Sequence, residues 1–269
     1  MIRQQAMEDA LRRAFASRGQ CPLQVEVFEE VGSTNSLLKE EAADGAAEGR
    51  LLVANAQTAG RGRLTRSFFS PSGTGVYSSL LLRPVTGPET TLLLTAAAAV
   101  AVIEAVRLVY GIETGIKWVN DIYYNERKIC GILAEGSFVP NGESFDYVVI
   151  GIGINLRTPH RGFPEELREI AGSLLGVGKE APSEDEQERD HRFVAALWAC
   201  FWQYYQELET RDYVSVYRAR SILTGRAVRV TAGTKERRAV VLEIDEDCRL
   251  LVRLEDGSVE ALSYGEVLF

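Results

Sequence analysis

Residues 57–66 read QTAGRGRLTR, and the chain continues with SFFSPSGTG to residue 75. Two glycines alternate with two arginines in this stretch, so the backbone can come close to an anion while guanidinium groups reach its oxygens. A solvated loop or a basic protein contact would account for scattered arginines, but not for the alternating glycines. The stretch therefore predicts a loop that binds a small polyanionic ligand, such as the phosphates of a nucleotide.

The surroundings of this loop carry no negative charge. No Asp or Glu occurs from residue 49 to residue 88, whereas five arginines do: Arg50, Arg61, Arg63, Arg66 and Arg83. The whole chain of 269 residues is nevertheless acidic, with 30 Lys and Arg against 38 Asp and Glu and a formal net charge of −8. Because affinity for nucleic acid comes largely from basic side chains that displace counterions, this balance argues against a duplex-binding protein.

Apolar patterning on both sides of the loop predicts an α+β fold, a mixed β-sheet flanked by helices. Strands are predicted at 25–31, 51–55, 76–82, 116–118, 121–124, 129–135 and 147–154. Helices are predicted at 2–16, from Ser33 or Thr34 through Ala42, from Pro88-Glu89 to Tyr110 with Gly111 as the stop, at 164–175 and at 190–208. Residues 125–127 are expected to form a hairpin turn, and 180–190 an acidic, solvated connection.

After residue 217 the sequence pattern changes to short strands separated by turns. Short strands are predicted at 228–230, 238–244, 249–254 and 258–262, with turns at 245–247 and 255–257. This pattern is typical of a small antiparallel barrel. We therefore expect a larger domain at 1–220, with a leader helix within 1–20, and a small barrel domain at 221–269.

Targeting signals are weak throughout. The N-terminus is charged, and the most apolar stretch, 90–103, is shorter than the roughly 18 residues that a membrane helix needs. The four cysteines form no C-x-x-C pair and only two histidines are present, so we expect reduced thiols rather than disulfides or zinc ligands. These features predict a cytoplasmic protein with no membrane partner.

Two further segments are candidates for a binding site. Lys117 lies where a buried strand is expected, and it either faces an anion or extends to solvent at the rim of the sheet. Residues 148–155 read VVIGIGIN, which lacks the last glycine and the loop-to-helix continuation of a dinucleotide fingerprint. Glycines within a buried strand indicate either close approach of a ligand or simply a closely packed core.

Together these segments resemble the biotin protein ligases (biotin–[acetyl-CoA-carboxylase] ligases). The resemblance rests on Ser33-Thr34-Asn35, the run 57–63 with Arg66, Ser70-Pro71 and Gly73, Lys117-Trp118-x-Asn120-Asp121 with Lys128 and Gly131, Gly151-x-Gly153-x-Asn155, and Gly265-Glu266-Val267. These segments occur in the order found in the family and span about residues 23–269. The implied fold is a class II synthetase-like biotin/lipoate ligase domain followed by an SH3-like barrel.

The resemblance implies a two-step, ATP-dependent reaction. The biotin carboxylate attacks the α-phosphate of ATP, which gives biotinyl-5′-AMP and pyrophosphate, and a lysine of a biotin carboxyl carrier domain then takes the biotinyl group. The implied substrates are ATP and biotin, with Mg²⁺ as the accompanying ion, and the implied partner is the carrier domain of acetyl-CoA carboxylase or pyruvate carboxylase. The residues that bind the metal ion are not identified by the sequence.

The family pattern also assigns site residues. The implied catalytic residues are Lys117 and Arg63. The implied biotin-binding residues are Ser33, Thr34, Asn35, Gln57, Arg61, Gly62, Arg63, Lys117, Gly131, Gly151 and Gly153. The residues implied to bind ATP or the adenylate are Arg61, Arg63, Arg66, Phe68, Lys117, Asn120 and Asn155.

Three positions depart from the family pattern. Phe68 stands where an aromatic residue, commonly Trp, is usual, Val119 replaces the usual Pro, and Leu64-Thr65 replaces a basic-Gly pair. About 20 residues precede the first predicted strand, so we expect a short form without a winged-helix domain and without operator binding. Homodimerisation is common in the family. The alternatives are a lipoate ligase, against which the glycine–arginine run argues, and a ligand-sensing module that has lost catalysis.

Overall fold

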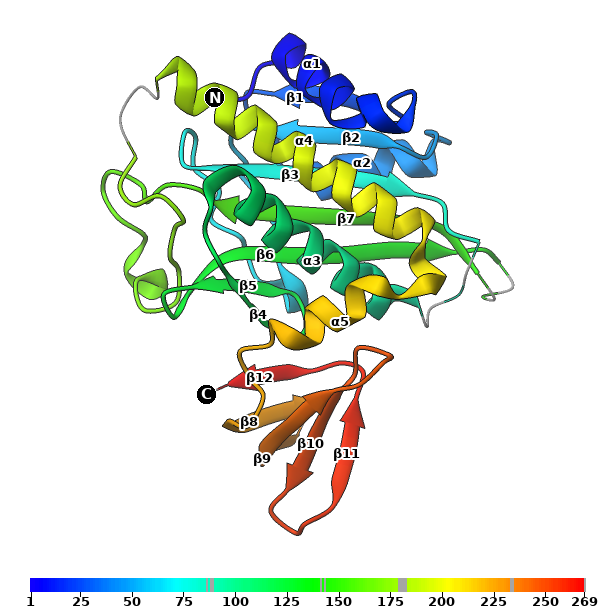
Figure 1. Ribbon diagram of the computed structural model, residues 1–269, viewed down its shortest axis with the longest axis vertical. Coiled ribbons are helices and arrows are strands. Elements are labelled where there is room, and N and C mark those ends of the chain that lie inside the picture. Colours follow the sequence, from blue (N-terminus) through cyan, green and yellow to red (C-terminus); the bar gives the residue numbers. More distant parts are fainter. Residues whose placement is uncertain are drawn as a thin grey trace.

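A seven-stranded mixed sheet forms the centre of the larger unit in the computed structural model, which describes residues 1–85, 87, 90–140, 142, 144–178, 183–232 and 235–268 (Figure 1). The strands are β1 (Gln24–Phe28), β2 (Arg50–Ala54), β3 (Gly75–Leu82), β4 (Gly115–Lys117), β5 (Asp121–Tyr124), β6 (Arg127–Phe138) and β7 (Phe145–Asn155). Their order is β1-β2-β3-β7-β6-β5-β4, and within it only the β1–β2 pair is parallel. The predicted mixed sheet is confirmed.

Helices cover both faces of this sheet unequally. One face packs against α1 (Gln4–Phe15), α3 (Thr91–Tyr110) and α4 (Glu184–Gln206), and the large hydrophobic core lies between them (Figure 1). The opposite face packs against α2 (Thr34–Ala43), over a smaller cluster formed by Leu38, Leu52, Leu81 and Val149. Because a single short helix covers this second face, part of it stays open for a ligand.

The long apolar helix α3 belongs to the core. It is long and apolar enough to cross a membrane, but 72% of its most apolar window is buried within the protein. Gly111 ends the helix in a left-handed conformation (φ 70°), as predicted. The predicted start at Pro88-Glu89 lies outside the described residues.

The prediction of a helix at 164–175 is wrong. Only Glu165–Leu167 forms a single 3₁₀ turn, and the following backbone pairs with distant strands instead. Lys128 N–H donates to the Ile170 carbonyl (2.8 Å) and Gly172 N–H to the Lys128 carbonyl (2.8 Å). The apolar residues that suggest a helix face here form one side of a cavity, and the tertiary pairing outweighs their local preference.

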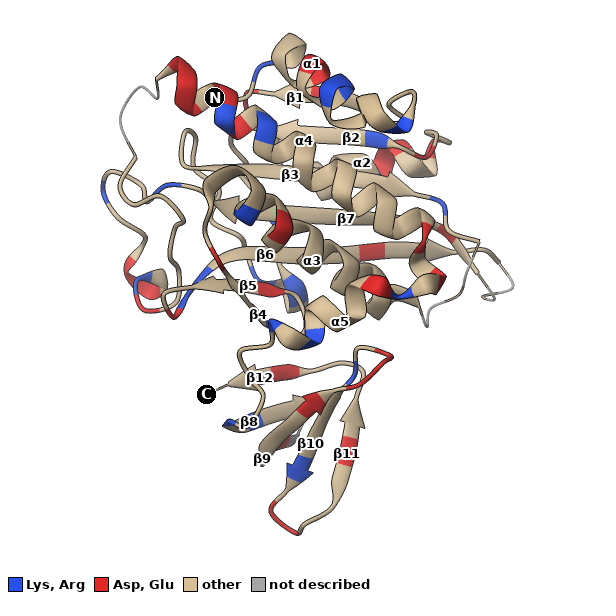
Figure 2. Cartoon of the chain, in the orientation of Figure 1, with Lys and Arg blue, Asp and Glu red and all other residues tan. Residues whose placement is uncertain are grey.

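Helix α4 begins before the predicted position 190. Ser183 caps it, and the Ser183 N–H donates a hydrogen bond to the Glu186 carboxylate (2.7 Å). Glu184, Asp185 and Glu186 occupy the first turn, where negative charge stabilises the helix dipole, and Figure 2 shows this acidic end clearly. Most of the predicted acidic connection is therefore helix, and residues 180–182 lie outside the described part of the chain.

A helix that the sequence pattern did not indicate, α5 (Asp212–Ala219), leads from the larger unit into a second, five-stranded antiparallel sheet. Its strands are β8 (Ala227–Ala232), β9 (Lys235–Ile244), β10 (Leu250–Leu254), β11 (Val259–Leu262) and β12 (Glu266–Leu268), in the order β11-β10-β9-β8-β12. The predicted small antiparallel barrel is confirmed, with β12 as an addition. The domain division at residue 220 stays a prediction.

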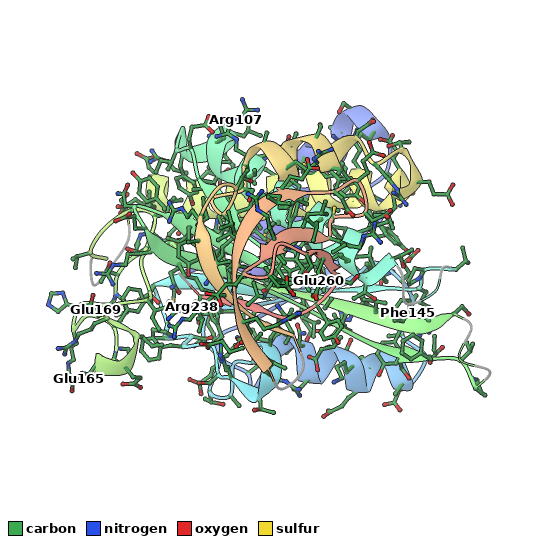
Figure 3. All side chains as sticks on the ribbon, turned by 90° about the horizontal axis from the view of Figure 1, so that it is seen from below. Arg107, Phe145, Glu165, Glu169, Arg238 and Glu260 are labelled. Carbon is green, nitrogen blue, oxygen red and sulfur yellow. The ribbon has the colours of Figure 1, made fainter. Side chains whose placement is uncertain are left out.

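Hydrogen bonds join the two units. The Trp118 indole N–H donates to the Cys248 carbonyl (2.9 Å), and Arg63 of the larger unit donates to the Gly265 carbonyl (3.2 Å). Within the larger unit, the Tyr217 hydroxyl of α5 donates to the Val119 carbonyl beside Trp118 (2.8 Å). Side chains of both units belong to one continuous hydrophobic cluster. Seen from the barrel end in Figure 3, Glu165 and Glu169 lie near one end of the large sheet and Phe145 near the other.

Candidate active site

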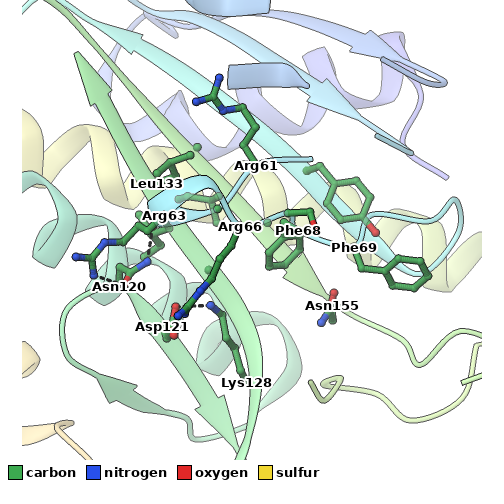
Figure 4. A pocket seen from close by; sticks show the side chains of 18 of the residues that line it. Arg61, Arg63, Arg66, Phe68, Phe69, Asn120, Asp121, Lys128, Leu133 and Asn155 are labelled. Carbon is green, nitrogen blue, oxygen red and sulfur yellow. Dashed lines mark hydrogen bonds and ion pairs between the residues drawn. The ribbon is translucent and has the colours of Figure 1, made fainter. Parts of the chain in front are cut away.

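A cavity of about 400 Å³ lies on the open face of the sheet. Its lining unites nearly all of the residues predicted for the site (Figure 4). They are Ser33, Thr34, Asn35, Gln57, Arg61, Gly62, Arg63, Arg66, Phe68, Asn120, Gly131, Gly151, Gly153 and Asn155. Residues from several segments between positions 33 and 155 thus meet around one space.

Neutral polar groups line one end of the cavity. Ser33 caps α2, which leaves Thr34 and Asn35 buried in its first turn. Gln57 Oε1 accepts hydrogen bonds from the Thr34 N–H (2.8 Å) and hydroxyl (3.1 Å), and Gln57 Nε2 donates to Ser70 Oγ (3.1 Å). These fixed amide and hydroxyl groups can recognise a ligand that offers both donors and acceptors.

The floor of the cavity comes from alternate residues of β7. Gly151, Gly153 and Asn155 face the ligand side, whereas the isoleucines between them pack in the core. A Cβ on Gly153 would lie 2.7 Å from the Phe68 ring, and one on Gly151 would overlap Asn35 Oδ1. The two glycines are therefore required by the close approach of the α2 and loop side chains to the sheet.

Cations gather at the other end, on the glycine–arginine loop (residues 60–66). Arg63 donates to Asn120 Oδ1 (3.1 Å) and to the Gly265 carbonyl (3.2 Å), so it reaches from the loop to the barrel. Arg66 pairs with Glu266 on β12 (2.6 Å) and Arg61 with Glu135 on β6 (3.0 Å). All three arginines thus border the cavity and are held by polar partners outside the loop.

The tip of this loop has an unusual backbone. Leu64 (φ 53°) and Thr65 (φ 64°) both adopt left-handed conformations, which cost free energy in residues that carry a Cβ. These two residues replace the basic-Gly pair that is usual in the resembling family. The exposed Leu64 side chain (64% exposed) makes this tip a segment with little packing to hold it.

Lys117 is the one predicted site residue outside the described cavity lining. Its Nζ lies over the Tyr123 ring, 5.6 Å from the ring centre. Burial, together with the nearby charge of Lys128, lowers the pKa of Lys117, although Asp121 acts in the opposite direction. Lys117 is nevertheless directly opposite Asp121 in the β4–β5 pair, so its side chain is on the same face of the sheet as the cavity, beside the residues that line it.

A different lysine provides an ammonium group to the cavity. Lys128, near the start of β6, lines the cavity and pairs with Asp121 Oδ1 at 2.6 Å (Figure 4). Its backbone is fixed on both sides by the bonds to Ile170 and Gly172 described above. Lys128 belongs to the family pattern described above, but the pattern assigns it no role. The feature of the sequence that points to it is its position just after the predicted turn at 125–127.

Two of the five arginines between residues 49 and 88 are remote from this site. Arg50 pairs with Glu26 and Glu41, and Arg83 donates to the Ala42 and Ala46 carbonyls and to Asp146. They lie at the start of β2 and just after β3, whereas the glycine–arginine loop joins the opposite ends of these antiparallel strands. The charge pattern overestimated the size of the basic site.

The cavity contains carboxylates as well as cations. Asp121 and Glu266 both line it, and each is already paired with a basic side chain. Among the residues that the structure describes, no cluster of three or more His, Cys, Asp or Glu could hold a metal ion.

Other lining residues were not predicted from the sequence. An apolar wall comes from Phe69, Phe163, Leu167, Ile170, Ala171 and Leu268. Phe68 lies edge-on to Tyr77, with the ring centres 6.3 Å apart, and forms the aromatic part of this space. A planar, aromatic portion of a ligand can pack here, between the cations and the sheet floor.

The chain matches two sequence families. The profile of the Biotin/lipoate A/B protein ligase family matches residues 27–155, and that of the Biotin protein ligase C terminal domain matches residues 223–269. The first match spans the glycine–arginine loop and ends at Asn155 of β7. The second spans the barrel.

Known proteins support the same grouping. The Bifunctional ligase/repressor BirA of Bacillus spizizenii is 36% identical over 234 residues, which cover 84% of this chain and 68% of that protein. The Biotin--[acetyl-CoA-carboxylase] ligase of Mycobacterium tuberculosis is 33% identical over 267 residues, 97% of this chain and 94% of that protein. A structure of biotin protein ligase from Aquifex aeolicus in complex with biotin and ATP matches with a TM-score of 0.72 and 27% identity, covering 91% of this chain and 97% of that one. The chain belongs to the biotin protein ligase family.

Proposed function

We propose that this protein activates biotin with ATP and transfers the biotinyl group to a lysine of a carboxyl carrier domain. A carboxylate oxygen of biotin forms a bond to the α-phosphorus while the bond to the β-phosphate oxygen breaks, so that pyrophosphate leaves. The acceptor amine then attacks the acyl carbon and loses a proton, and AMP leaves. Family membership supports this reaction, as does the division of one cavity into a neutral polar end and a cationic end.

The cationic end fits the first step. A carboxylate approaching a phosphate brings two anions together, and positive groups fixed in a partly enclosed site offset their repulsion. We assign this role to Arg63 and Lys128, which both line the cavity. Arg61 and Arg66 are assigned to the remaining phosphate oxygens and to covering the adenylate, which hydrolyses readily in water.

The remaining lining residues divide between the two ligands. Ser33, Thr34, Asn35 and Gln57 are assigned to the ureido head group of biotin, since they present both donors and acceptors. Phe68, Asn120 and Asn155 are assigned to the nucleotide, next to the cations. Mg²⁺ accompanies ATP as a substrate-bound ion, because the protein offers no cluster of ligands of its own within the described residues.

We further propose a cytoplasmic location and, as acceptor, the carrier domain of acetyl-CoA carboxylase or pyruvate carboxylase. The net charge of −8 favours a protein acceptor over nucleic acid, and the burial of α3 favours a core role for that helix over a membrane role. Homodimer formation remains a hypothesis drawn from the family.

The deciding experiment incubates the protein with ATP, Mg²⁺, labelled biotin and a purified carrier domain. We expect biotin-dependent exchange of pyrophosphate into ATP and one label per carrier lysine. Exchange that lipoate stimulates and biotin does not would identify a lipoate ligase. Biotin binding without any label on the carrier would identify a sensing module, and either result would refute the proposal.

A further inference from the structure

Glu135 on β6 gathers three hydrogen-bond donors beside the cavity. Its Oε2 accepts from Asn35 Nδ2 (3.0 Å), and its Oε1 lies 2.8 Å from Lys39 Nζ and 3.0 Å from Arg61 Nη2. The side chain is 16% exposed. Burial alone would raise the pKa of Glu135, but the bonds from Lys39 and Asn35 and the charge of Arg61 hold it below its ordinary value. The group is therefore an ionised carboxylate at neutral pH.

An ionised carboxylate can only accept hydrogen bonds, and this fixes the orientation of its neighbours. The Asn35 amide must turn its NH₂ group toward Glu135, so Asn35 Oδ1 points to Ser79 and accepts from its hydroxyl (2.6 Å). The Ser79 hydroxyl has one proton, which faces both Asn35 Oδ1 and Thr34 Oγ1 (2.7 Å), while the Thr34 hydroxyl donates its own proton to Gln57 Oε1. Glu135 thus decides which end of the Asn35 amide faces Ser79, beside the polar end of the cavity.

The same carboxylate also restrains the glycine–arginine loop. Arg61 has Glu135 as its ion-pair partner and a weaker contact with Ser36 Oγ (3.5 Å). One side chain on the rigid sheet thus contacts both α2, which presents the head-group residues, and the loop, which presents the cations. Glu135 itself is not among the described residues that line the cavity.

We propose that Glu135 is a positioning residue that sets the donor–acceptor polarity of the biotin head-group site and places Arg61 beside it. The inference rests on the proposed function and adds to it a residue that contacts neither substrate. Without the acceptor-only group, Asn35 can turn its amide over and present its NH₂ group to Ser79, the Ser79 proton then goes to Thr34 alone, and the ureido group of biotin meets a mismatched partner at Asn35.

The test is the Glu135→Gln variant, which keeps the shape but places an NH₂ group opposite at least one of the three donors. Biotin binding is measured by calorimetry without ATP, and KM for biotin and kcat by pyrophosphate exchange. We expect the Kd and KM for biotin to rise about tenfold, with kcat within about threefold of the parent. The melting temperature should fall by only about 3 °C or less, since the carboxylate is at the edge of the core.

Lys39→Met is the matched control, because it removes one partner of Glu135 and leaves Asn35 and Arg61 in place. We expect its Kd for biotin to stay within about twofold of the parent. Glu135→Asp, which keeps an acceptor-only carboxylate, should bind biotin more tightly than Glu135→Gln.

Three results would overturn the inference: a Glu135→Gln variant with parental affinity for biotin, an equal loss of affinity in Lys39→Met, or a Glu135→Asp variant that binds biotin more weakly than Glu135→Gln. A parent that binds biotin but labels no carrier would refute the ligase reaction and not this inference, which the binding data test separately.

Discussion

At the scale of single residues, two lysines compete for the role of stabilising the reacting phosphate. The family resemblance assigns this role to Lys117, and the cavity lining assigns it to Lys128. Both lie on the cavity face of the sheet, where Lys128 lines the cavity and Lys117 lies beside Asp121, over the Tyr123 ring. We expect Lys128→Met to lower the rate of adenylate formation at least tenfold, because a charge-assisted contact is worth about 1.5–3 kcal/mol. We expect a smaller loss in Lys117→Met, because Lys117 is not among the described residues that line the cavity. Biotin-dependent pyrophosphate exchange measures both.

A control for this comparison concerns Asp121, which loses its ion-pair partner when Lys128 is replaced. The double variant Lys128→Met/Asp121→Asn removes the unpaired carboxylate and should be as inactive as the single variant. Recovery of activity in the double variant would show that the unpaired charge, and not the missing ammonium, caused the loss. A large loss in Lys117→Met with normal Lys128→Met would return the role to Lys117.

The sequence was informative for residues whose type and spacing carry the chemistry by themselves. The alternating Gly and Arg of residues 60–63 identify an anion-binding loop, and Gly151 and Gly153 indicate a close approach to a strand. Lys128 and Glu135 have no such local pattern. Their neighbours Ile170 and Asn35 are distant in the chain, so only the fold reveals what they contact.

At the scale of elements, strands and capped helices followed their local signals. Ser33 caps α2, Gly111 ends α3, and the turn at Asn125-Glu126 has positive φ at both residues, all close to the predicted positions. The segment 164–175 did not follow its local signal, because backbone groups of β6 and β7 accept and donate along it. Local pattern fails where a segment is paired by residues far along the chain.

Helix α1 is anchored by contacts that depend on pH. The Arg3 N–H donates to His191 Nε2 (3.0 Å), and Asn55 holds the Ile2 backbone at both N–H and C=O. Burial lowers the pKa of His191, with the charges of Arg3 and the N-terminus acting in the same direction and Glu188 against them. Folding therefore favours the neutral form of the His191 side chain.

Because the pKa of His191 is lowered by folding, the stability of the protein falls as the pH falls. Unfolded His has a pKa near 6.5, so below about pH 6.5 the unfolded chain takes up a proton that the folded chain resists. This contribution to stability is complete above about pH 6.5 and is lost as the pH falls toward the lowered folded pKa. In His191→Gln the amide oxygen can still accept from Arg3 but does not titrate. We expect the melting temperature of the parent to fall more steeply than that of His191→Gln between pH 7.5 and 5.0. Parallel curves would contradict the assignment.

At the scale of the whole molecule, the barrel is part of the active-site wall. Glu266 and Leu268 line the cavity, and the Gly265 carbonyl accepts from Arg63. The side chains of the two units form one hydrophobic cluster, and Trp118 (3% exposed) lies at their junction. An interface this apolar should hold the units in a fixed relation, so that the loop arginines meet the same barrel residues.

The shared core predicts that the two units unfold together. In urea, far-UV circular dichroism and tryptophan fluorescence should give one coincident transition, because loss of the barrel would expose Trp118, whose indole N–H bonds to the Cys248 carbonyl. Trp118→Phe removes the bond to the Cys248 carbonyl and part of the contact area. We expect it to destabilise the protein by about 1–3 kcal/mol and, if the interface is the main coupling, to separate the transitions seen by the two probes. Two transitions in the parent, or a Trp118→Phe variant as stable as the parent, would show that the barrel folds independently of the larger unit.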